Sequence, residues 1–552
     1  MNRFHLLIFA LMMTVAAHAQ FVNNGATVTI QSGATLRVET SFENQAGTIT
    51  IDNGGILEVQ GNFTNDAGAG TTISPSGKVR FIGTGNSDVT LNGDAINQVE
   101  MAKTTSTGKV TLLGNASING NLEFTGTGNN KIELGNFDLS LATTSTVSAA
   151  TDHTTNGYVV TGGTGRLRKS NLGTTPFTYP VGFDATTYNP ITISENGTAD
   201  TIGVRVLQHA YVNGASGTQI NTEAVNATWA ITESIPGNSN LNITAQWNAT
   251  DELPSFTSNE CGVGRYNGTT YDLLIADLGA ASGAGPYTRS RSGVTPGNFI
   301  VGDDKALSYL SVNAKVFLHG PYGYSTNSSG VMSDDLRTLL PSTEPYTGYS
   351  DFTYLGRRSG ETIDPARFTI TDNTAVVDWV FLQLRNTTSP FNVIVTKSAL
   401  LQKDGNIVDT DSGPVKFLGV PEGNYRIAIR HRNHLGVMTA NNKTMNFGVP
   451  VSINFTNNTE PVEGGLTNLN YVSGGSNPAY VLIPGDGNSS GNVSASDNVT
   501  IWRPNNSQNV TSTNYLLNIG KADYNLSGTV SASDNVQMWR PNNSKFQAFS
   551  NN

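Results

Sequence analysis

The chain has 552 residues, a formal net charge of −10 and one cysteine, Cys261; the length predicts three or four domains, at about 100 to 200 residues each. Its 59 glycines and its low content of charged residues, 13%, are typical of short strands joined by turns, so we expect a mostly β protein. The acidic charge, without any run of Lys or Arg, excludes the usual electrostatic signature of nucleic-acid and anionic-lipid binding, and a single cysteine excludes an intramolecular disulfide.

The first residues, MNRFHLLIFALMMTVAAHAQ, combine a basic start, an apolar stretch and the small-residue site Ala17-His18-Ala19. This pattern is typical of a cleavable secretory signal peptide, here residues 1–19, so we expect the mature chain to begin at Gln20. The apolar stretch is shorter than the ~20 residues that a membrane-spanning helix needs, and no other segment reaches that length. The sequence therefore predicts an extracellular protein without a transmembrane segment, either free or attached to the cell surface.

The mature N-terminus repeats with a period of twenty-one or twenty-two residues. GATVTIQSGATLRVETSFEN is followed by GTITIDNGGILEVQGNFTN and TTISPSGKVRF, which aligns Ile30 with Ile51 and Ile73. Apolar residues alternate within each unit, so each unit supplies two short strands that cannot bury their apolar face alone. Stacked units can bury it, and we expect a parallel β-helix, or β-solenoid, over residues 20–145. An ordinary β-sandwich with similar hairpins is the alternative.

Two further β domains are expected after the solenoid. Strand-like alternation without a fixed period predicts an antiparallel β-sandwich over residues 146–306, and continuous apolar strands predict a second, prealbumin-like sandwich over residues 307–459. The stretches FTYPVG, TWAITESIPG and CGVGRYNG resemble a module of large secreted bacterial surface proteins. VVDWVFLQLR and GVPEGNYRIAIRHRNHLGVMTA resemble a hemagglutinin-like or adhesin-like domain of such proteins. The resemblance implies surface adhesion without naming a ligand.

The C-terminal segment, residues 479–552, is called the tail below. Residues 460–478, EPVEGGLTNLNYVSGGSNP, lack apolar periodicity and predict a flexible linker in front of it. The tail contains a duplication, because NVSASDNVTIWRPNNS, starting at Asn492, returns as TVSASDNVQMWRPNNS, starting at Thr529. We therefore expect the tail to be a small separate module built from two similar halves.

Two twelve-residue segments of the tail, DGNSSGNVSASD (486–497, loop 1) and DYNLSGTVSASD (523–534, loop 2), match the calcium loop of EF-hand type. Oxygen-bearing side chains stand at positions one, three, five, nine and twelve, position seven offers a backbone carbonyl, and glycine at position six allows the sharp reversal. Two matches in register argue against ordinary polar turns. The sequence predicts two bound Ca²⁺ ions, with ligands from Asp486, Asn488, Ser490, Asn492, Ser494 and Asp497, and from Asp523, Asn525, Ser527, Thr529, Ser531 and Asp534.

After each loop a short apolar stretch, NVTIW or NVQMW, predicts one helix of about two turns that ends at Pro504 or Pro541. A pair of units, each a calcium loop followed by one helix, resembles a dockerin, the module that binds cohesin domains. The resemblance implies a cohesin-like or other surface protein as partner. Packing of the two tryptophans against each other, as the core of a small module, is their alternative role. The partner-contacting residues that the resemblance implies are Ala495, Ser496, Trp502, Arg503, Ala532, Ser533, Trp539 and Arg540.

No catalytic motif is evident in the sequence. His431 and His434 suggest a metal pair, but residues three apart on a strand point to opposite faces, and the neighbouring YRIAI does not predict the turn that joint ligation needs. There is no HExxH motif and no P-loop. Acidic pairs that folding assembles, as in glycosidases, cannot be seen in a sequence. We therefore predict no catalytic residue and no cofactor other than Ca²⁺.

Together these features predict a secreted, multidomain bacterial surface or adhesion protein, without enzymatic activity, whose C-terminal interaction module is stabilised by calcium. A glycan or host-surface ligand is the expected partner of the upstream domains. The alternative is a carbohydrate-active protein, or one associated with polysaccharide degradation, that carries a dockerin, since β-helices also host polysaccharide lyases. A β-helix lyase should place acidic and basic residues together on one exposed sheet, whereas these coils offer mainly Thr, Ser, Asn and Gly.

Overall fold

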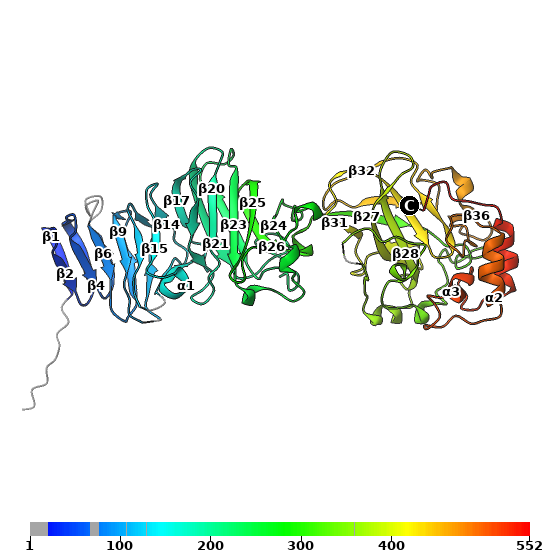
Figure 1. Ribbon diagram of the computed structural model, residues 1–552, viewed down its shortest axis with the longest axis horizontal. Coiled ribbons are helices and arrows are strands. Elements are labelled where there is room, and N and C mark those ends of the chain that lie inside the picture. Colours follow the sequence, from blue (N-terminus) through cyan, green and yellow to red (C-terminus); the bar gives the residue numbers. More distant parts are fainter. Residues whose placement is uncertain (1–19, 67–76, 106, 128–129, 358, 552) are drawn as a thin grey trace, which may run out of the picture. The chain divides into compact units, whose positions relative to one another are not determined.

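The structure is a computed structural model that describes residues 20–66, 77–105, 107–127, 130–357 and 359–551 (Figure 1). The expected signal peptide and Ile73 of the third repeat lie outside these residues. The chain forms two compact units. Unit 1 comprises Met1–Gly268 with Gly279–Ala306, and unit 2 comprises Thr269–Leu278 with Leu307–Asn552.

A parallel β-solenoid of about seven turns forms the N-terminal part of unit 1, so the fold predicted from the repeat is confirmed. Phe21 lies opposite Phe42, and Phe42 opposite Phe63, as the period requires. One sheet contains β1 (Phe21–Ile30), β3 (Phe42–Ile51), β5 (Phe63–Asn65), β7 (Ser87–Thr90), β10 (Lys109–Leu112), β13 (Asn130–Glu133), β16 (Gly157–Val160) and β19 (Val181–Gly182). A second contains β2 (Thr35–Val38), β4 (Ile56–Val59), β6 (Lys78–Phe81), β9 (Gln98–Met101), β12 (Leu122–Phe124) and β15 (Val147–Ala149).

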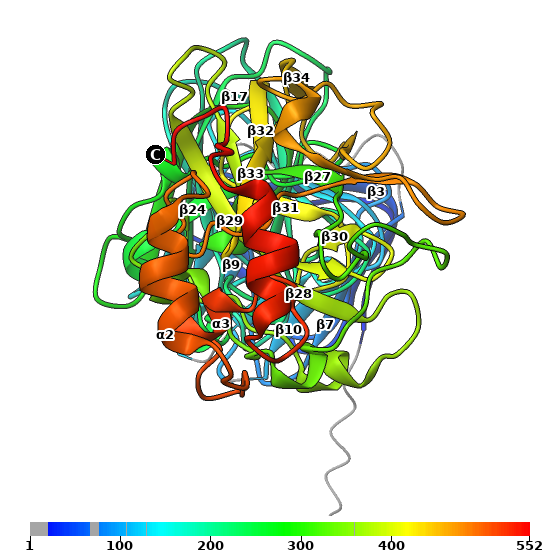
Figure 2. The same cartoon turned by 90° about the vertical axis from the view of Figure 1, so that its right-hand side faces the viewer.

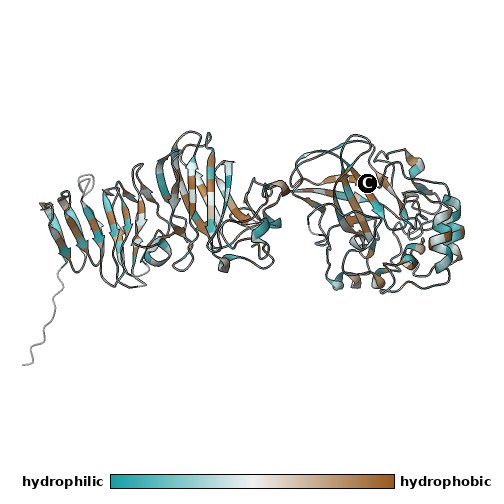
Figure 3. Cartoon of the chain, viewed as in Figure 1, coloured by the Kyte–Doolittle hydropathy of each residue, from teal (hydrophilic) through white to brown (hydrophobic). Residues whose placement is uncertain are grey.

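The coils are held in register by ladders of identical side chains. The rings of Phe21, Phe42 and Phe63 stack at centroid distances of 5.2 and 5.1 Å. Beside them, the buried Asn44 accepts a hydrogen bond from Nδ2 of Asn23 and donates one to Oδ1 of Asn65, both at 2.8 Å. Apolar and polar residues alternate along these strands, as the hydropathy colours show (Figure 3). The ladders therefore satisfy buried amides while the apolar faces close the core.

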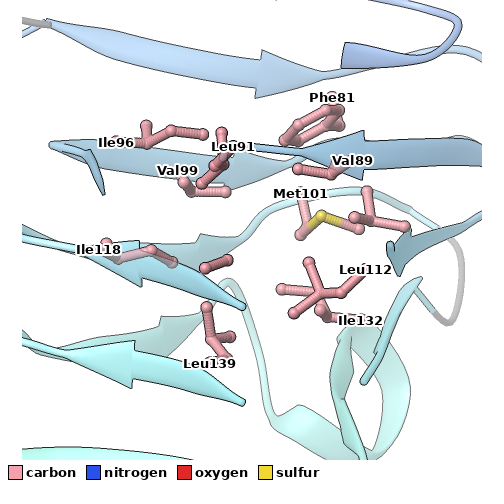
Figure 4. A pocket seen from close by; sticks show the side chains of 12 residues that line it. Phe81, Val89, Leu91, Ile96, Val99, Met101, Leu112, Ile118, Ile132 and Leu139 are labelled. Carbon is pink, nitrogen blue, oxygen red and sulfur yellow. The ribbon is translucent and has the colours of Figure 1, made fainter. Parts of the chain in front are cut away.

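The interior of the middle coils contains a small void of about 30 Å³. It is lined only by apolar side chains, among them Phe81, Leu91 and Met101, which point into it from successive coils (Figure 4). A buried water needs two to four polar partners, so this void is a dry packing gap and not a ligand site.

The solenoid continues without a break into the antiparallel part of unit 1. Parallel pairing extends past residue 145 to Gly182, and β17 (Leu167–Leu172) then pairs in parallel with β14 (Leu139–Leu141) on one side and antiparallel with β21 (Asp200–Leu207) on the other. The two parts thus share one sheet and one buried core. That sheet contains β8 (Ala95–Ile96), β11 (Ala116–Ile118), β14 (Leu139–Leu141), β17 (Leu167–Leu172), β21 (Asp200–Leu207), β22 (Thr228–Glu233), β26 (Gly297–Gly302) and β24 (Gly262–Arg265); its neighbour contains β18 (Phe177–Tyr179), β20 (Ile191–Glu195), β23 (Leu241–Trp247) and β25 (Tyr287–Val294), and a short helix, α1 (His153–Asn156), precedes β16.

Unit 2 is built on one nine-stranded, mainly antiparallel sheet. All ten residues of its long strand β28 (Val376–Arg385) are buried, which matches the continuous apolar run that the sequence shows there. The strands are β27 (Tyr309–Lys315), β28 (Val376–Arg385), β29 (Val393–Gln402), β30 (Asn406–Val408), β31 (Val415–Leu418), β32 (Gly423–His431), β33 (His434–Met438), β34 (Lys443–Met445) and β35 (Val451–Asn454).

The tail does not form the separate module that the sequence suggested. The expected linker contains β36 (Asn470–Val472), which pairs with β37 (Ala479–Val481). Val510, Tyr515 and Leu526 of the tail lie in the same buried core as the sheet. In Figure 2 the tail helices lie in front of β32 and β33. These helices are the π-helical segment Asp497–Trp502 with α2 (Arg503–Asn505), α3 (Asn518–Ala522), and the π-helical segment Asp534–Trp539 with α4 (Arg540–Asn542).

The asparagine ladder leads to a first prediction. Asn44→Ala should lower the free energy of unfolding of unit 1 by about 1–3 kcal/mol, because it leaves the buried amides of Asn23 and Asn65 without one partner each. Chemical denaturation followed by circular dichroism measures this change. Asn53→Ala, at an exposed turn of the same coil, is the matched control and should be close to the wild type. Equal stabilities for the two variants would contradict the role of the ladder.

Candidate calcium site

The first aspartate of each loop is buried and organises the loop around its carboxylate. In loop 1, Oδ1 of Asp486 accepts a hydrogen bond from the backbone N–H of Ser490 at 2.8 Å, and Oδ2 accepts one from Gly491 at 2.9 Å. In loop 2, Asp523 accepts the equivalent bonds from Ser527 at 3.1 Å and from Gly528 at 2.8 Å. The residues at positions one, five and six therefore meet in both loops, as the pattern predicted.

The last aspartate of each loop closes it from the start of the following helix. Asp497 is fully buried and accepts the backbone N–H groups of Asn488 at 3.0 Å and Ser494 at 2.8 Å. Asp534 does the same with Asn525 and Ser531, at 3.0 and 2.7 Å. Positions three, nine and twelve are thus held together in each loop. The remaining predicted ligands, Asn492 and Thr529, occupy position seven of the same turns.

Backbone geometry explains which residues each loop needs. Gly491 and Gly528, at position six, have φ values of 83° and 85°, a region that favours glycine. Ser489 and Leu526, at position four, also have positive φ values, 54° and 55°, which the sequence did not reveal. An Asn or Gly residue at position four would have signalled a positive φ, but the two loops have Ser and Leu there.

The electrostatics of both loops favour a cation. Burial and the neighbouring Asp497 carboxylate raise the pKa of Asp486 to about 7, and burial together with Asp534 raises the pKa of Asp523 to about 7. Burial also raises the pKa values of Asp497 and Asp534. Within the described residues, none of the four carboxylates forms a salt bridge with a Lys, Arg or His. Two buried carboxylates with Asn and Ser oxygens around them fit a hard cation such as Ca²⁺.

The two halves of the tail complete each other. Nε1 of Trp502 donates a hydrogen bond to the carbonyl oxygen of Ser531, at position nine of loop 2, at 3.0 Å. Nε1 of Trp539 donates to the carbonyl oxygen of Ser494, at position nine of loop 1, at 2.9 Å. Each tryptophan is half-buried. Its burial is therefore too small for a pure core role and too large for a fully exposed interface role. The duplication therefore produces a pseudo-symmetric pair in which each helix supports the other loop.

The predicted partner-contacting residues lie mostly on the surface. Ala495, Ser496 and Ala532 are exposed, and so are Arg503 and Arg540, whereas Ser533 is half-buried. The structure adds one equivalent pair that the sequence analysis missed. Val499 and Val536 are each 50% exposed on the two π-helical segments. The adjoining Ile501 and Met538 take the inward positions.

Each helix includes its proline and ends one residue later, at Asn505 or Asn542, so the predicted ends are correct to within one residue. Each helix continues through Pro504 or Pro541, because the segment before the proline is π-helical. The backbone N–H of Arg503, for example, bonds to the carbonyl oxygen of Asn498, five residues earlier. This wider turn leaves room for the proline ring, which would clash with an earlier carbonyl in an α-helix. Proline itself has no N–H and so donates no hydrogen bond to the helix.

A buried ionic cluster joins the tail to the sheet. Asp378 on β28 lies 2.8 Å from Nη2 of Arg432, and it also accepts a hydrogen bond from the hydroxyl of Tyr515 in the tail. All three side chains are fully buried. Burial alone would raise the pKa of Asp378, but Arg432 and His431 hold it well below its ordinary value. The cluster therefore keeps one ionised carboxylate inside the apolar core.

The histidine pair lies beside this cluster. His431 and His434 flank a hairpin turn between β32 and β33, so the turn that the sequence did not predict is present and brings their Nδ1 atoms within 3.2 Å. Nε2 of His431 lies 3.2 Å from Asp378, and Nε2 of His434 lies 3.0 Å from the carbonyl oxygen of His319. Every ring nitrogen has a protein neighbour, so the pair braces the hairpin.

A ladder of charges runs across the outer face of the second solenoid sheet. Arg80 lies 2.9 Å from Glu58 and 3.0 Å from Glu100, and Lys78 lies 2.9 Å from Glu100 and 2.7 Å from Glu123. Acidic and basic residues therefore do gather on one sheet, and the expectation of coils with mainly small polar residues is wrong for this face.

Comparisons with known proteins found no matching family model, curated protein or solved structure. No helix in the described part of the chain is long and apolar enough to cross a membrane. Among the described residues there is no group of three or more His, Cys, Asp or Glu side chains that could hold a metal ion. Each loop contributes only two carboxylates, and its other oxygens come from Asn, Ser, Thr and the backbone.

The buried cluster leads to a second prediction. Asp378→Asn should lower the free energy of unfolding of unit 2 by about 3–5 kcal/mol, because it leaves the buried Arg432 guanidinium without its counter-charge. Denaturation monitored by tryptophan fluorescence measures this loss. Asp372→Asn, at an exposed turn just before the same strand, is the control and should leave the stability near that of the wild type. A tolerated Asp378→Asn would show that the cluster does not hold the tail.

Proposed function

We propose that loops 1 and 2 each bind one Ca²⁺ ion and that the protein is a secreted surface or adhesion protein with a calcium-stabilised C-terminal interaction region. One observation carries the calcium assignment: two equivalent pairs of buried carboxylates occur in register, none of the four forms a salt bridge among the described residues, and the pKa values of Asp486 and Asp523 stay raised despite the nearby charges of Arg430 and Arg432. When bound, the ion supplies the positive charge that both carboxylates of a loop need. Asp486, Asp497, Asp523 and Asp534 neutralise it, and the polar side chains around them complete the oxygen shell.

The interaction role is supported by the repeated surface of the tail. The same exposed positions occur twice, once in each half, and they combine an apolar side chain with an arginine. Val499 with Arg503 and Val536 with Arg540 form these two equivalent patches. Arginine and apolar groups are favoured in protein interfaces. A protein partner of the cohesin kind, as the dockerin resemblance implies, is therefore the proposed ligand of the tail.

The polysaccharide-active alternative has one observation in its favour, the charge ladder on the solenoid. Its electrostatics argue for a structural role. Burial alone would lower the pKa of Lys78, but hydrogen bonds to Glu123 and Glu100 raise it above its ordinary value. Burial alone would raise the pKa of Glu100, yet Thr125 and Lys78 lower it. A catalytic base needs a lysine whose pKa is lowered towards neutrality, so these charges instead set the register of the coils.

Calcium titration tests the proposal. The mature chain, residues 20–552, should bind two Ca²⁺ ions in calorimetry, with dissociation constants of about 10⁻⁵ to 10⁻³ M because each loop has only two carboxylates. Asp497→Asn and Asp534→Asn should each remove one ion, since they keep the size of the side chain and delete its charge. Asp404→Asn, in a turn of the same unit that also caps a backbone N–H, should still bind two. No heat of binding with the wild type would refute the calcium assignment.

The affinity should also depend on pH. Asp486 and Asp523 have pKa values of about 7 without a cation, so protons compete with calcium below neutrality. We expect about tenfold weaker binding at pH 6 than at pH 8. In chelator, the free energy of unfolding should change with pH in the opposite direction to the calcium affinity. A raised carboxyl pKa stabilises the fold at low pH, and this contribution is lost as the pH rises through 7. Equal affinities at the two pH values would contradict the burial of these carboxylates.

A further inference from the structure

The hairpin tip between β32 and β33, Arg432-Asn433, lies against both loops of the tail. On the side of loop 1, the hydroxyl of Ser489 donates a hydrogen bond to the carbonyl oxygen of Arg432 at 3.0 Å. The backbone N–H of Gly485, which directly precedes the loop, donates to the carbonyl oxygen of Asn433 at 3.0 Å. The tip therefore fixes both the entry and the fourth position of loop 1.

On the side of loop 2, the same two residues bind the segment that leads into the loop. Nδ2 of Asn433 donates a hydrogen bond to the backbone carbonyl oxygen of Asp523 at 2.7 Å. Nη1 of Arg432 donates to the carbonyl oxygen of Gly520. Asp523 is the first proposed ligand of loop 2, so Asn433 fixes the backbone from which that carboxylate projects.

The tip itself has little freedom to move. Arg432 and Asn433 are fully buried, and the ion pair with Asp378 ties the guanidinium to the central strand of the sheet. Oδ1 of Asn433 lies 2.8 Å from Nδ1 of His434, which holds the amide in one orientation. A buried side chain with defined partners on both sides transmits a displacement of one loop to the other.

We propose that Asn433 is a positioning residue for both calcium loops, through which the two ions bind cooperatively and fasten the tail to the sheet. This inference rests on the proposed calcium binding. It adds that the two ion sites are not independent and that they are completed by a strand hairpin outside the tail. Direct contacts between the halves, such as the bond from Tyr524 to the carbonyl oxygen of Asp497 at 3.0 Å, act in the same direction.

The test is a calcium titration of residues 20–552 by calorimetry, with Asn433→Ala compared with the wild type. The wild type should give a Hill coefficient above one. Asn433→Ala should weaken both sites, loop 2 by about tenfold for the loss of one buried hydrogen bond, and should lower the Hill coefficient towards one. Asn327→Ala is the matched control, since Asn327 is also buried and braces a loop of unit 2 without touching the tail loops. Its calcium affinity should equal that of the wild type.

Coupling can also be measured from the other loop, which covers the case in which Asn433→Ala does not fold. In an Asp497→Asn background only loop 2 binds, and adding Ser489→Ala, on loop 1, should weaken that remaining site. Wild-type affinity and cooperativity in Asn433→Ala, or an unchanged loop 2 site in the double variant, would overturn the positioning role. Absence of calcium binding in the wild type would instead refute the proposed function itself.

Discussion

One buried ion pair, between Asp378 and Arg432, is the contact on which unit 2 depends. Both side chains are fully buried, and an unpaired charge at that depth costs several kcal/mol, so neither can leave without the other. Asp378 belongs to the central strand, Arg432 to the hairpin tip, and Tyr515, which donates to the same carboxylate, to the tail. Sheet, hairpin and tail therefore share one charge. If the tail separated, the Asp378 carboxylate would lose the hydrogen bond from Tyr515, which explains why the tail is an integral part of the unit.

Features that depend on neighbouring residues could be predicted from the sequence, and features that depend on distant ones could not. The solenoid was predictable because Phe21, Phe42 and Phe63 repeat one local pattern at a fixed spacing, and the turn of each proposed calcium loop is likewise contained within twelve residues. The docking of the tail brings Tyr515 to Asp378, 137 positions earlier, and Asp378 pairs with Arg432, 54 positions later, and no local pattern records such contacts. One signal was nevertheless available. Asp378 stands inside the apolar run VVDWVFLQLR, and a carboxylate in a buried strand requires a cationic or hydrogen-bonding partner elsewhere.

The reciprocal contacts explain why the two halves of the tail are so similar. The backbone of Val493 exchanges hydrogen bonds with Ser544 and Lys545, and that of Val530 does so with the equivalent residues after the first helix. Each loop is therefore closed by the chain that follows the other helix. A substitution in one half changes the surroundings of the other, so the matching residues must fit each other as well as their own loop.

The two units satisfy their charges in different ways, and this difference is why the proposed calcium dependence is assigned to unit 2. On the solenoid sheet, Lys78 and Arg80 are paired with glutamates of adjacent coils, so that surface needs no external ion. In the tail, the four loop carboxylates lie buried in pairs, and burial raises their pKa values although Arg430 and Arg432 act in the opposite direction on Asp486 and Asp523. Because these loops rest on the hairpin of the sheet, neutralising them stabilises the sheet and the tail together. Calcium would then set the rigidity of the whole unit, while the exposed patches at Val499 and Val536 remain free for a partner.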